Sequence, residues 1–595
     1  MTDLSNTKNE IKPEDDVGHT PRKANTVMQD VDHVASVSEP ELNALSPGDS
    51  INVQDLEKEG KAKVALIMST LCLCVLLAAL DQTIIATAVP VIAENFHSSA
   101  TYTWIGSSYL LATSASATSW GKFSDIWGRK PILLLAVSLF FVGSLLCAIS
   151  SNSTMIIGGR AVLGAGGGGV LTLVNICISD LFSMRNRPKY FGIIGIVWAF
   201  ASSIGPVIGG IFTQKVCHRF VPITGICFVV LVSCLQIHNP RTPLFEGLAA
   251  VDWLGCITSI GGTIMLLIGL EFGGIKFPWS SATVICLIIS GVVTTGIFIV
   301  VEWKIAKYPI LPLRIFSHRS NIATLGVNFV HGFSFISAAY YIPLYFQVVL
   351  GAAPLLSGVY FLVFSISLSF TSLLAGAMIS ITGRYLCILR LGLALMTLGI
   401  GLLIDLPDHI SWPRIALYQL VTGIGAGPNF QAPIIALQAM VAPRDIAMAT
   451  ATYVFIRSLA ISMSIVIGGV IFQNGMQLRL PQLIQKIGPS AASILSGSSA
   501  GASVGIVASL PPPEARIARH AYWESMRNMW ILYAAVGAAG IIMSIFVTEK
   551  SLSKHHEETR TGLQNLERRR VTEKTVEELA AESEEVNAEE GKEKI

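Results

Sequence analysis

Long apolar runs separated by short polar segments constrain this sequence more than any other feature. A helix that crosses about 30 Å of hydrocarbon needs about 20 predominantly apolar residues, and the runs between residues 64 and 548 have roughly this length. The composition agrees, since 52% of the residues are hydrophobic and 13% are charged, whereas soluble globular proteins average about 25% charged residues. The chain is therefore predicted to be an all-α polytopic membrane protein.

Fourteen membrane-spanning helices are predicted from these runs. They lie at residues 64–88, 102–120, 132–149, 155–178, 190–213, 220–237, 252–271, 282–302, 322–345, 355–380, 386–405, 414–437, 447–472 and 529–548. Because the number of spans is even, both termini are expected on the same side of the membrane.

The distribution of Lys and Arg gives the orientation of these helices, because short loops rich in these residues stay on the cytoplasmic side. The loops predicted to be cytoplasmic carry Lys122, Arg129, Lys130, Arg185, Arg187, Lys189, Arg241, Lys304, Lys307, Arg314, Arg319, Arg384 and Arg444. The short loops predicted to be outside carry Lys215, Arg219 and Lys276, with Arg414 at a helix edge. Both termini are therefore predicted to be cytoplasmic.

Two halves of the sequence repeat one pattern. The repeat pairs Gly121 with Gly376, Gly128 with Gly383, Arg129 with Arg384, Gly164 with Gly423 and Gly166 with Gly425. Repeated halves are typical of transporters, in which two bundles rock about a central site near the middle of the bilayer. The sequence thus predicts two six-helix bundles with two helices inserted between them.

Five parts of the chain follow from this plan. They are a disordered cytoplasmic N-terminal tail at 1–62, a six-helix bundle at 63–238, two inserted helices with a cytoplasmic linker at 239–320, a second six-helix bundle at 321–549 with a long outside loop at about 473–528, and a charged cytoplasmic C-terminal tail at 550–595.

The segment Gly121–Pro131 is predicted to be a short charged turn between two apolar runs. Gly121 and Gly128 permit the tight backbone that such a connection requires. Asp125 is placed to pair with Arg129 or to face the start of the following helix. A solvated charged turn of no special function explains the same residues, and the segment alone does not decide between the two interpretations.

Asp81 is an ionisable residue inside the first apolar run. Such a residue costs roughly 2.5 to 3.5 kcal/mol on insertion scales, so it normally faces a polar cavity or a partner. A carboxylate that is exposed to each side of the membrane in turn can load and release a proton, which makes Asp81 the best candidate for a coupling site. The alternative is a structural ion pair. Arg160, which keeps its charge, is the natural neighbour in both cases.

Two other apolar runs carry patterns of small residues. Arg160 is followed by a glycine-rich stretch at 164–169, and glycine allows membrane helices to pack closely. In the run 190–213, Gly192 is followed by Gly205-Pro206 and by the pair Gly209-Gly210. Proline and glycine bend a membrane helix and let it approach its neighbours.

Together these motifs resemble those of the major facilitator superfamily, in particular its fourteen-helix drug:proton antiporters, to which fungal toxin and multidrug efflux pumps belong. The resemblance covers about residues 60 to 550. It implies three sets of functional residues: a conformational latch of Gly121, Asp125, Gly128, Arg129 and Lys130; a proton-coupling pair of Asp81 and Arg160; and an exporter-type helix motif of Gly192, Gly205, Pro206, Gly209 and Gly210.

A substrate cavity between the bundles is expected to be lined by polar and aromatic residues of the spans. The candidates are Gln82, Trp198, Asn328, Tyr341, Gln347, Gln438 and Arg457. Each of these residues can also serve as an ordinary helix contact, and aromatic residues gather at membrane interfaces as well. The identity of the substrate does not follow, because cavity shape depends on many dispersed side chains.

Motifs of several other protein classes are absent from the sequence. The Walker A pattern of ATP-driven pumps and the His-Glu-x-x-His zinc pattern do not occur, and the ten cysteines show no metal-ligand spacing. The sequence therefore predicts no enzyme, no cofactor, no metal site and no nucleic-acid partner. The proton gradient is the expected energy source.

The predicted function is proton-coupled secondary active export of amphipathic organic compounds, such as drugs, fungal toxins or other secondary metabolites. One alternative is another fourteen-helix porter that imports siderophores or moves basic amino acids into a vacuole, and a second is a non-transporting receptor on the same fold. The expected partners are a small-molecule substrate and the lipid bilayer, and the chain is expected to act as a monomer. A plasma-membrane location is expected, with an internal membrane as the alternative.

Overall fold

The computed structural model describes residues 61–95, 99–212, 242–274, 277–495, 507, 509–555, 561–565 and 567–568. All of them belong to one unit of the chain, Ile51–Ile595. In this described part the regular structure is helical, and the β-type pairing is confined to one isolated bridge between Gly273 and Phe277. The predicted all-α fold is confirmed.

The first half contains helices α4 (Lys61–Asn95), α5 (Ser99–Trp127), α6 (Arg129–Ala148), α7 (Ser153–Leu181) and α8 (Arg187–Phe212). The insert contains α10 (Leu244–Ala250), α11 (Trp253–Phe272) and α12 (Ala282–Lys304). The second half contains η2 (Leu313–Phe316), α13 (Arg319–Val348), α14 (Pro354–Thr382), α15 (Leu386–Leu403), α16 (Trp412–Ala426), η3 (Gly427–Phe430), α17 (Ala432–Met440), η4 (Pro443–Asp445), α18 (Ile446–Ile487), α19 (Pro489–Ile494) and α21 (Pro512–Ile545).

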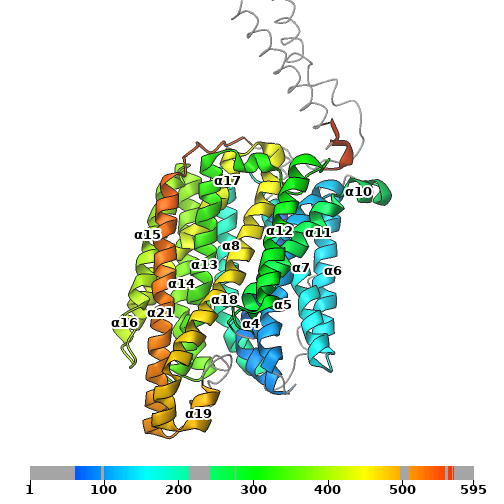
Figure 1. Ribbon diagram of the computed structural model, residues 1–595. Helices are drawn as coiled ribbons and strands as arrows, with labels where there is room; N and C mark the ends of the chain where they lie inside the picture. The colour runs from blue at the N-terminus through cyan, green and yellow to red at the C-terminus, as the bar shows by residue number, and fades with distance from the viewer. Residues whose placement is uncertain are drawn as a thin grey trace, which may run out of the picture. The chain divides into compact units, whose positions relative to one another are not determined.

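Every predicted span coincides with one or more of these helices except 220–237, which lies outside the described residues. Within the described residues, ten helices are long and apolar enough to cross a membrane (Figure 1). Their exposed surfaces carry large apolar side chains, among them Leu135, Ile289, Val292, Phe370, Leu398 and Ile542. Such surfaces are expected where helices face lipid, since hydrocarbon offers no hydrogen-bond partners.

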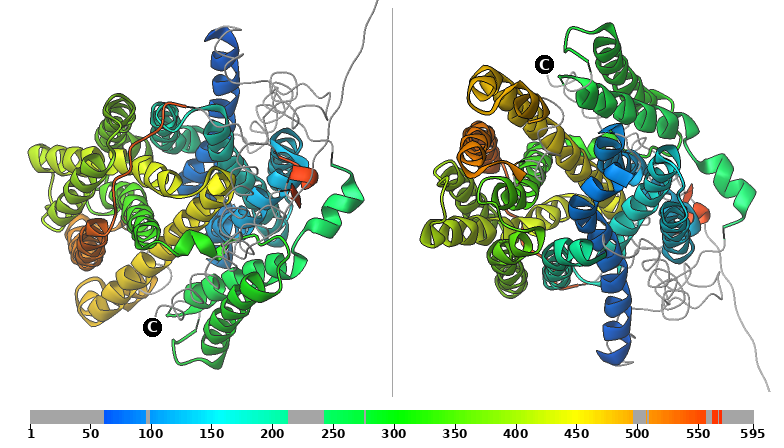
Figure 2. Two further views of the ribbon diagram at one scale, coloured as in Figure 1. Left: turned by 90° about the horizontal axis from the view of Figure 1, so that it is seen from above. Right: turned by 90° about the horizontal axis from the view of Figure 1, so that it is seen from below.

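The two halves pack against each other through equivalent helices. A Cβ atom on Gly121 of α5 would lie 2.6 Å from the Cβ of Ala451 on α18, and a Cβ on Gly376 of α14 would overlap the carbonyl oxygen of Pro188 on α8. The second long helix of each half therefore contacts the fifth helix of the other half. Figure 2 shows the two groups of helices viewed along their axes, with α11 and α12 (green) beside them.

The glycines that the two halves share in sequence also make equivalent helix contacts within each half. A Cβ on Gly164 of α7 would lie 2.8 Å from Cα of Tyr109 on α5, and a Cβ on its counterpart Gly423 of α16 would lie 2.6 Å from the carbonyl oxygen of Phe364 on α14. Glycine is thus used at matching positions to bring the fourth and second helices of each half together.

The charged segment Gly121–Pro131 is more helical than predicted. Helix α5 continues to Trp127 and α6 begins at Arg129, so only Gly128 lies between them. Gly128 has φ 94° and ψ 163°, a backbone conformation that favours glycine. A single residue of this kind makes the turn, and the charged side chains around it project from helix ends.

The predicted helix 414–437 is divided into α16, η3 and α17. The break begins at Gly427 and Pro428. Proline lacks an amide hydrogen and its ring clashes with the preceding turn of an α-helix, so the continuous span expected from hydropathy is wrong at this point. The break places Phe430 in a 3-10 segment between the two α-helices.

The segment 473–528, predicted to be a long outside loop, is largely helical in its described part. Helix α18 continues to Ile487 and α21 begins at Pro512. The two extensions pack on each other, since Arg479 Nε donates to Glu524 Oε2 at 2.7 Å and a Cβ on Gly475 would lie 2.9 Å from Cβ of Ser525. Hydropathy predicts only the apolar part of a helix. The helix itself extends as far as side-chain packing stabilises it.

Part of the predicted C-terminal tail contacts the helices. The backbone N–H of Lys550 donates to Tyr385 Oη at 2.9 Å, and the carbonyl oxygen of Ser553 accepts from the backbone N–H of Arg185 at 3.1 Å. Further on, the N–H of Gly562 donates to the carbonyl oxygen of Asp125 at 2.8 Å. The described part of this tail is therefore attached to both halves and is not fully solvated.

Candidate functional site

Three consecutive residues of α4 face three different surroundings, because successive residues of an α-helix point about 100° apart. Asp81 pairs with Arg160 on α7. Gln82 lines a cavity between the two halves. Thr83 donates its hydroxyl hydrogen to the carbonyl oxygen of Ala201 on α8 at 3.0 Å. One turn of α4 thus joins a charge pair, a cavity and a neighbouring helix.

The Asp81–Arg160 pair lies inside the membrane-spanning helices. Arg160 Nη1 donates to Asp81 Oδ2 at 2.5 Å, and Arg160 Nε donates to the carbonyl oxygen of Ile105 at 3.0 Å. The Arg160 guanidinium also lies 4.6 Å from the ring centroid of Tyr109. The Arg160 side chain is 4% exposed, while that of Asp81 is 26% exposed. The guanidinium is therefore held by several partners, and the carboxylate is the more accessible member of the pair.

The glycine motif of α8 brings that helix close to two others. A Cβ on Gly205 would overlap Thr83 Oγ1 and lie 2.7 Å from Thr83 Cβ on α4. A Cβ on Gly192 would lie 3.3 Å from the carbonyl oxygen of Ser372 on α14. Helix α8 thus connects the helix that carries Asp81 with the second half. Pro206, Gly209 and Gly210 lie on the same helix, and their contacts are outside the described structure.

The predicted latch residues are centred on one of their own members, the buried Arg129 at the start of α6. Arg129 is 1% exposed and donates through Nη1 to Asp125 Oδ1 at 2.6 Å and to Ser124 Oγ at 2.7 Å. Its Nε donates to Asp180 Oδ2 at 2.7 Å. Gly121 contacts α18 one turn before Asp125, and Lys130 follows Arg129 at the half-buried start of α6.

Asp180 belongs to this cluster, and sequence reasoning missed it. It lies near the C-terminal end of α7, two residues beyond the predicted span 155–178. An acidic residue directly after an apolar run was the available signal. Its partner Arg129 is 51 residues away in the chain, so spacing alone does not connect them.

Polar contacts join the two halves near the C-terminal ends of α7, α14 and α17. Gln438 Nε2 donates to Ser179 Oγ at 2.7 Å, and Arg187 Nη1 donates to Gln438 Oε1 at 3.1 Å. Arg185 Nε donates to the carbonyl oxygen of Ser380 at 2.5 Å at the end of α14. Gln438, a candidate for the cavity, therefore lies between the halves and bridges them.

A cavity lies between the two halves and has an empty volume of about 810 Å³, open solvent included. Its lining comes from α4, α5, α7 and α8 of the first half and from α13, η3, α17 and α18 of the second half. It is mainly apolar and aromatic with a few polar groups, which is the usual composition of a small-molecule site. Of the predicted candidates, Gln82, Trp198 and Arg457 line it.

The remaining cavity candidates make contacts between helices. Asn328 Nδ2 donates to the carbonyl oxygen of Tyr453 at 2.8 Å, and Tyr341 Oη donates to that of Ile465 at 2.9 Å. Gln347 Nε2 lies 3.4 Å from Ser357 Oγ. These three residues do not line the cavity.

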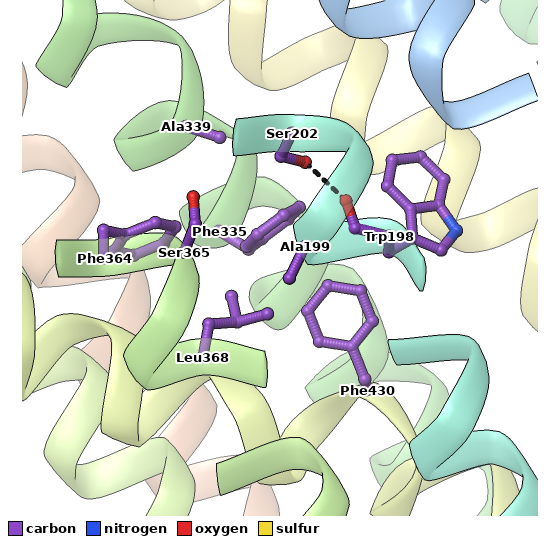
Figure 3. A pocket seen from close by; sticks show the side chains of 9 residues that line it. All are labelled: Trp198, Ala199, Ser202, Phe335, Ala339, Phe364, Ser365, Leu368 and Phe430. Atoms are coloured by element: carbon purple, nitrogen blue, oxygen red, sulfur yellow. Dashed lines mark hydrogen bonds between the residues drawn. The ribbon is translucent and has the colours of Figure 1, made fainter. Parts of the chain in front are cut away.

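A smaller cavity of about 230 Å³ empty volume, open solvent included, shares three aromatic residues with the larger one. Trp198 on α8, Phe335 on α13 and Phe430 on η3 line both cavities, and Figure 3 shows them together with Phe364 and Leu368. Phe335 and Phe430 were not predicted. Phe430 reaches this place because the helix breaks at Pro428, which hydropathy does not reveal.

Comparisons with known proteins agree with this architecture. The family profile described as Major Facilitator Superfamily matches residues 71–465. The efflux pump dotC of Dothistroma septosporum is 47% identical over 86% of this chain and 88% of its own length. The MFS-type transporter ppz2 of Metarhizium majus is 45% identical over 87% of this chain and 90% of its own length.

A solved structure shows the same fold at much lower identity. The proton:xylose symporter XylE, bound to 6-bromo-6-deoxy-D-glucose, matches 82% of this chain and 98% of its own chain with a TM-score of 0.53 and 13% identity. The extent of the family match, the identity with the fungal relatives and the membrane-spanning helices lead to one conclusion. This chain belongs to the Major Facilitator Superfamily and is a membrane transporter, not an enzyme.

Proposed function

We propose that this transporter is a proton-coupled exporter of amphipathic organic compounds, such as drugs, toxins or other secondary metabolites. The observation that carries the proposal is the Asp81–Arg160 pair at 2.5 Å inside the membrane. A proton that binds Asp81 neutralises the carboxylate and weakens its attraction for Arg160, which keeps its charge. One site thus has two charge states, which a proton-driven cycle requires.

The position of Asp81 supports coupling between the proton and the substrate. The next residue, Gln82, lines the cavity, and Thr83 binds α8 at Ala201, one turn after the cavity residue Trp198. A displacement of α4 on protonation would therefore act on two walls of the cavity. Two-state packing of this kind is how small changes at one site are passed to another.

Two observations favour export. The motif of α8 is of the exporter type, and Gly205 within it contacts the turn of α4 that carries Asp81. The similar protein dotC is named an efflux pump. The plasma membrane is the proposed location, where a monomer would use the inward proton gradient to expel its substrate.

The test is efflux of fluorescent dyes and drugs from energised cells that express the wild type or Asp81→Asn, with and without a protonophore. Efflux is expected to require both Asp81 and the gradient. Asp405→Asn is the matched control, because the Asp405 side chain is 69% exposed in the loop between α15 and α16. Equal amounts of each variant at the cell surface must be verified.

Other outcomes lead to other conclusions. Efflux that stops with the protonophore but survives Asp81→Asn would place the proton site at another residue. Efflux that is insensitive to both would exclude proton coupling. Accumulation of substrate in cells or vacuoles would indicate an importer or a vacuolar porter, and binding without transport would indicate a receptor.

A further inference from the structure

The larger cavity between the two halves, called the central cavity below, contains an arginine that has no acidic partner within the described structure. Arg457 on α18 is the one charged residue among the described residues that line the cavity. No carboxylate in the described ranges forms an ion pair with it. Its Nη2 is buried and has no hydrogen-bond partner among the described residues.

Other contacts hold Arg457 in place. Its Nη1 donates to Tyr453 Oη at 3.2 Å, and its guanidinium lies 4.3 Å from the ring centroid of Phe430. A Cβ on Gly332 of α13 would lie 3.3 Å from Arg457 Cγ, so the aliphatic stem packs closely on that helix. The positive group is thus positioned at the cavity wall, and its Nη2 has no hydrogen-bond partner among the described residues.

Two of the buried arginines in the described helices, Arg129 and Arg160, are neutralised by acidic partners. Arg129 binds Asp125 and Asp180, and Arg160 binds Asp81. An arginine keeps its charge in proteins, and a buried charge is costly unless it is paired and hydrogen-bonded. Arg457 differs from both, because it is half-buried at the cavity wall and no acidic partner among the described residues neutralises its charge.

The surroundings of Arg457 are aromatic. Trp198, Phe335 and Phe430 line the same cavity, and the rings of Phe335 and Phe430 meet edge to face with centroids 4.9 Å apart. Flat aromatic groups pack well on such walls. A ligand that satisfies both features has an aromatic body and a negatively charged group.

We propose that the substrates of this exporter are aromatic organic anions whose acidic group binds the Arg457 guanidinium while the ring system packs against Trp198 and Phe430. This inference rests on the proposed function, because it takes the central cavity as the transport site. A hydrogen bond between charged groups is stronger than one between neutral groups, so the acidic group distinguishes these substrates from neutral compounds of the same shape. Cationic compounds are disfavoured by the positive charge, which also opposes the alternative of a porter for basic amino acids.

The test measures binding of 1-pyrenebutyrate and of its neutral amide, 1-pyrenebutyramide, to the purified full-length transporter in lipid nanodiscs without a proton gradient. The wild type is expected to bind the acid at least about tenfold more tightly than the amide. Arg457→Gln and Arg457→Met are expected to lose this preference and to bind the amide as the wild type does. Arg457→Lys, which keeps the charge but not the forked geometry, should retain part of it.

Arg390→Gln is the matched control. Arg390 Nε donates to the carbonyl oxygen of Ser544 at 3.2 Å at the end of α21, away from the cavity. This variant should bind both probes as the wild type does. Unfolding temperatures show whether each variant is folded, and two neutral replacements of Arg457 allow a decision if one of them is not.

The proposal is overturned if the wild type binds the two probes equally, if it binds neither, or if the preference for the acid persists in the neutral variants. These results would not touch the proposed proton coupling, because no gradient is present in this assay. Conversely, gradient-driven transport of the neutral amide tests proton coupling independently of Arg457.

Discussion

At the scale of single residues, the missing side chain of Gly205 sets how closely α4 and α8 approach. A Cβ there would overlap Thr83 Oγ1, two residues from Asp81. The substitution Gly205→Ala is therefore expected to destabilise the protein by about 1 to 3 kcal/mol, the usual cost of overpacking, and to impair transport. Thermal unfolding in detergent measures the first effect and efflux the second.

A matched glycine gives the control for this prediction. Among the described residues, no atom of a neighbour lies within 4 Å of a Cβ added to Gly401 on α15. Because alanine is the better helix former by up to about 1 kcal/mol, Gly401→Ala should leave stability unchanged or raise it. Equal behaviour of the two variants would show that the approach of α4 and α8 is not limited by Gly205.

Asp180 supplies the second residue prediction. It shares the buried Arg129 with Asp125, and removing one partner of a buried ion pair is strongly destabilising. Asp180→Asn should therefore lower the free energy of unfolding, and this loss should shrink in an Arg129→Gln background. A double-mutant cycle is expected to give a coupling energy of about 0.5 to 3 kcal/mol. Additive effects would mean that the 2.7 Å contact contributes little.

At the scale of elements, the N-terminal part of α21 contacts the loop between α15 and α16 through the acidic side chain of Asp408. His409 Nδ1 lies 3.1 Å from Asp408 Oδ1, and His520 Nδ1 on α21 lies 3.3 Å from Asp408 Oδ2. The hydrogen bond with His409, followed by the one with His520, holds the pKa of Asp408 below its ordinary value.

The sign of the resulting pH dependence follows from linkage. A carboxyl group whose pKa is lower in the folded state stabilises the protein above its unfolded pKa, about 3.9 for Asp, and this contribution is lost as the pH falls through the folded pKa. Asp408→Asn should therefore lower the unfolding temperature at neutral pH, and the difference from the wild type should shrink on acidification. A difference that does not vary with pH would contradict this account.

The helices also show what the sequence can and cannot predict. Hydropathy locates the spans because apolar length is a local property. Asp125 can be expected to reach Arg129 because only a short turn separates them in the chain, and the structure pairs them at 2.6 Å across Gly128. The extensions of α18 beyond residue 472 and of α21 before residue 529 escape this reasoning. Arg479 and Glu524 are polar, and contacts between the two helices, such as the Arg479–Glu524 pair and the close approach of Gly475 to Ser525, support a helix there.

Residues of the candidate site can be predicted where a sequence motif identifies them. Asp81 and Arg160 were identified as a pair and lie at 2.5 Å. Phe430 and the bridging position of Gln438 depend on how α16, η3 and α17 are broken and packed against the other half. These positions depend on contacts between residues that are far apart in the chain. The pattern of a single sequence does not reveal such contacts.

At the scale of the whole transporter, Gln438 joins the two halves near the C-terminal ends of α7 and α17. It contacts Ser179 and Arg187 of the first half, and a hydrogen bond contributes about 0.5 to 1.5 kcal/mol net. Gln438→Ala should therefore reduce the population in which these ends are closed. Spin labels at the exposed positions Lys189 and Thr382 should report a larger share of long distances.

Gln419→Ala is the control for this measurement. Gln419 is buried in α16 and donates to the carbonyl oxygen of Ile415 in the same helix at 3.2 Å. Its loss should leave the distance distribution unchanged. An unchanged distribution in Gln438→Ala as well would mean that the other contacts between the halves are sufficient for closure.

The charge of Arg457, which has no acidic partner in the described part of the chain, has a consequence for how membrane voltage acts on transport. If an anion leaves while a proton enters, as the two proposals together require, each cycle moves two positive charges inward. One charge is worth about 2.3 kcal/mol per 100 mV, so an inside-negative potential assists both movements. Export of an aromatic anion should then continue at equal pH on the two sides when a potassium diffusion potential is imposed, which makes voltage by itself a sufficient source of energy for this transporter.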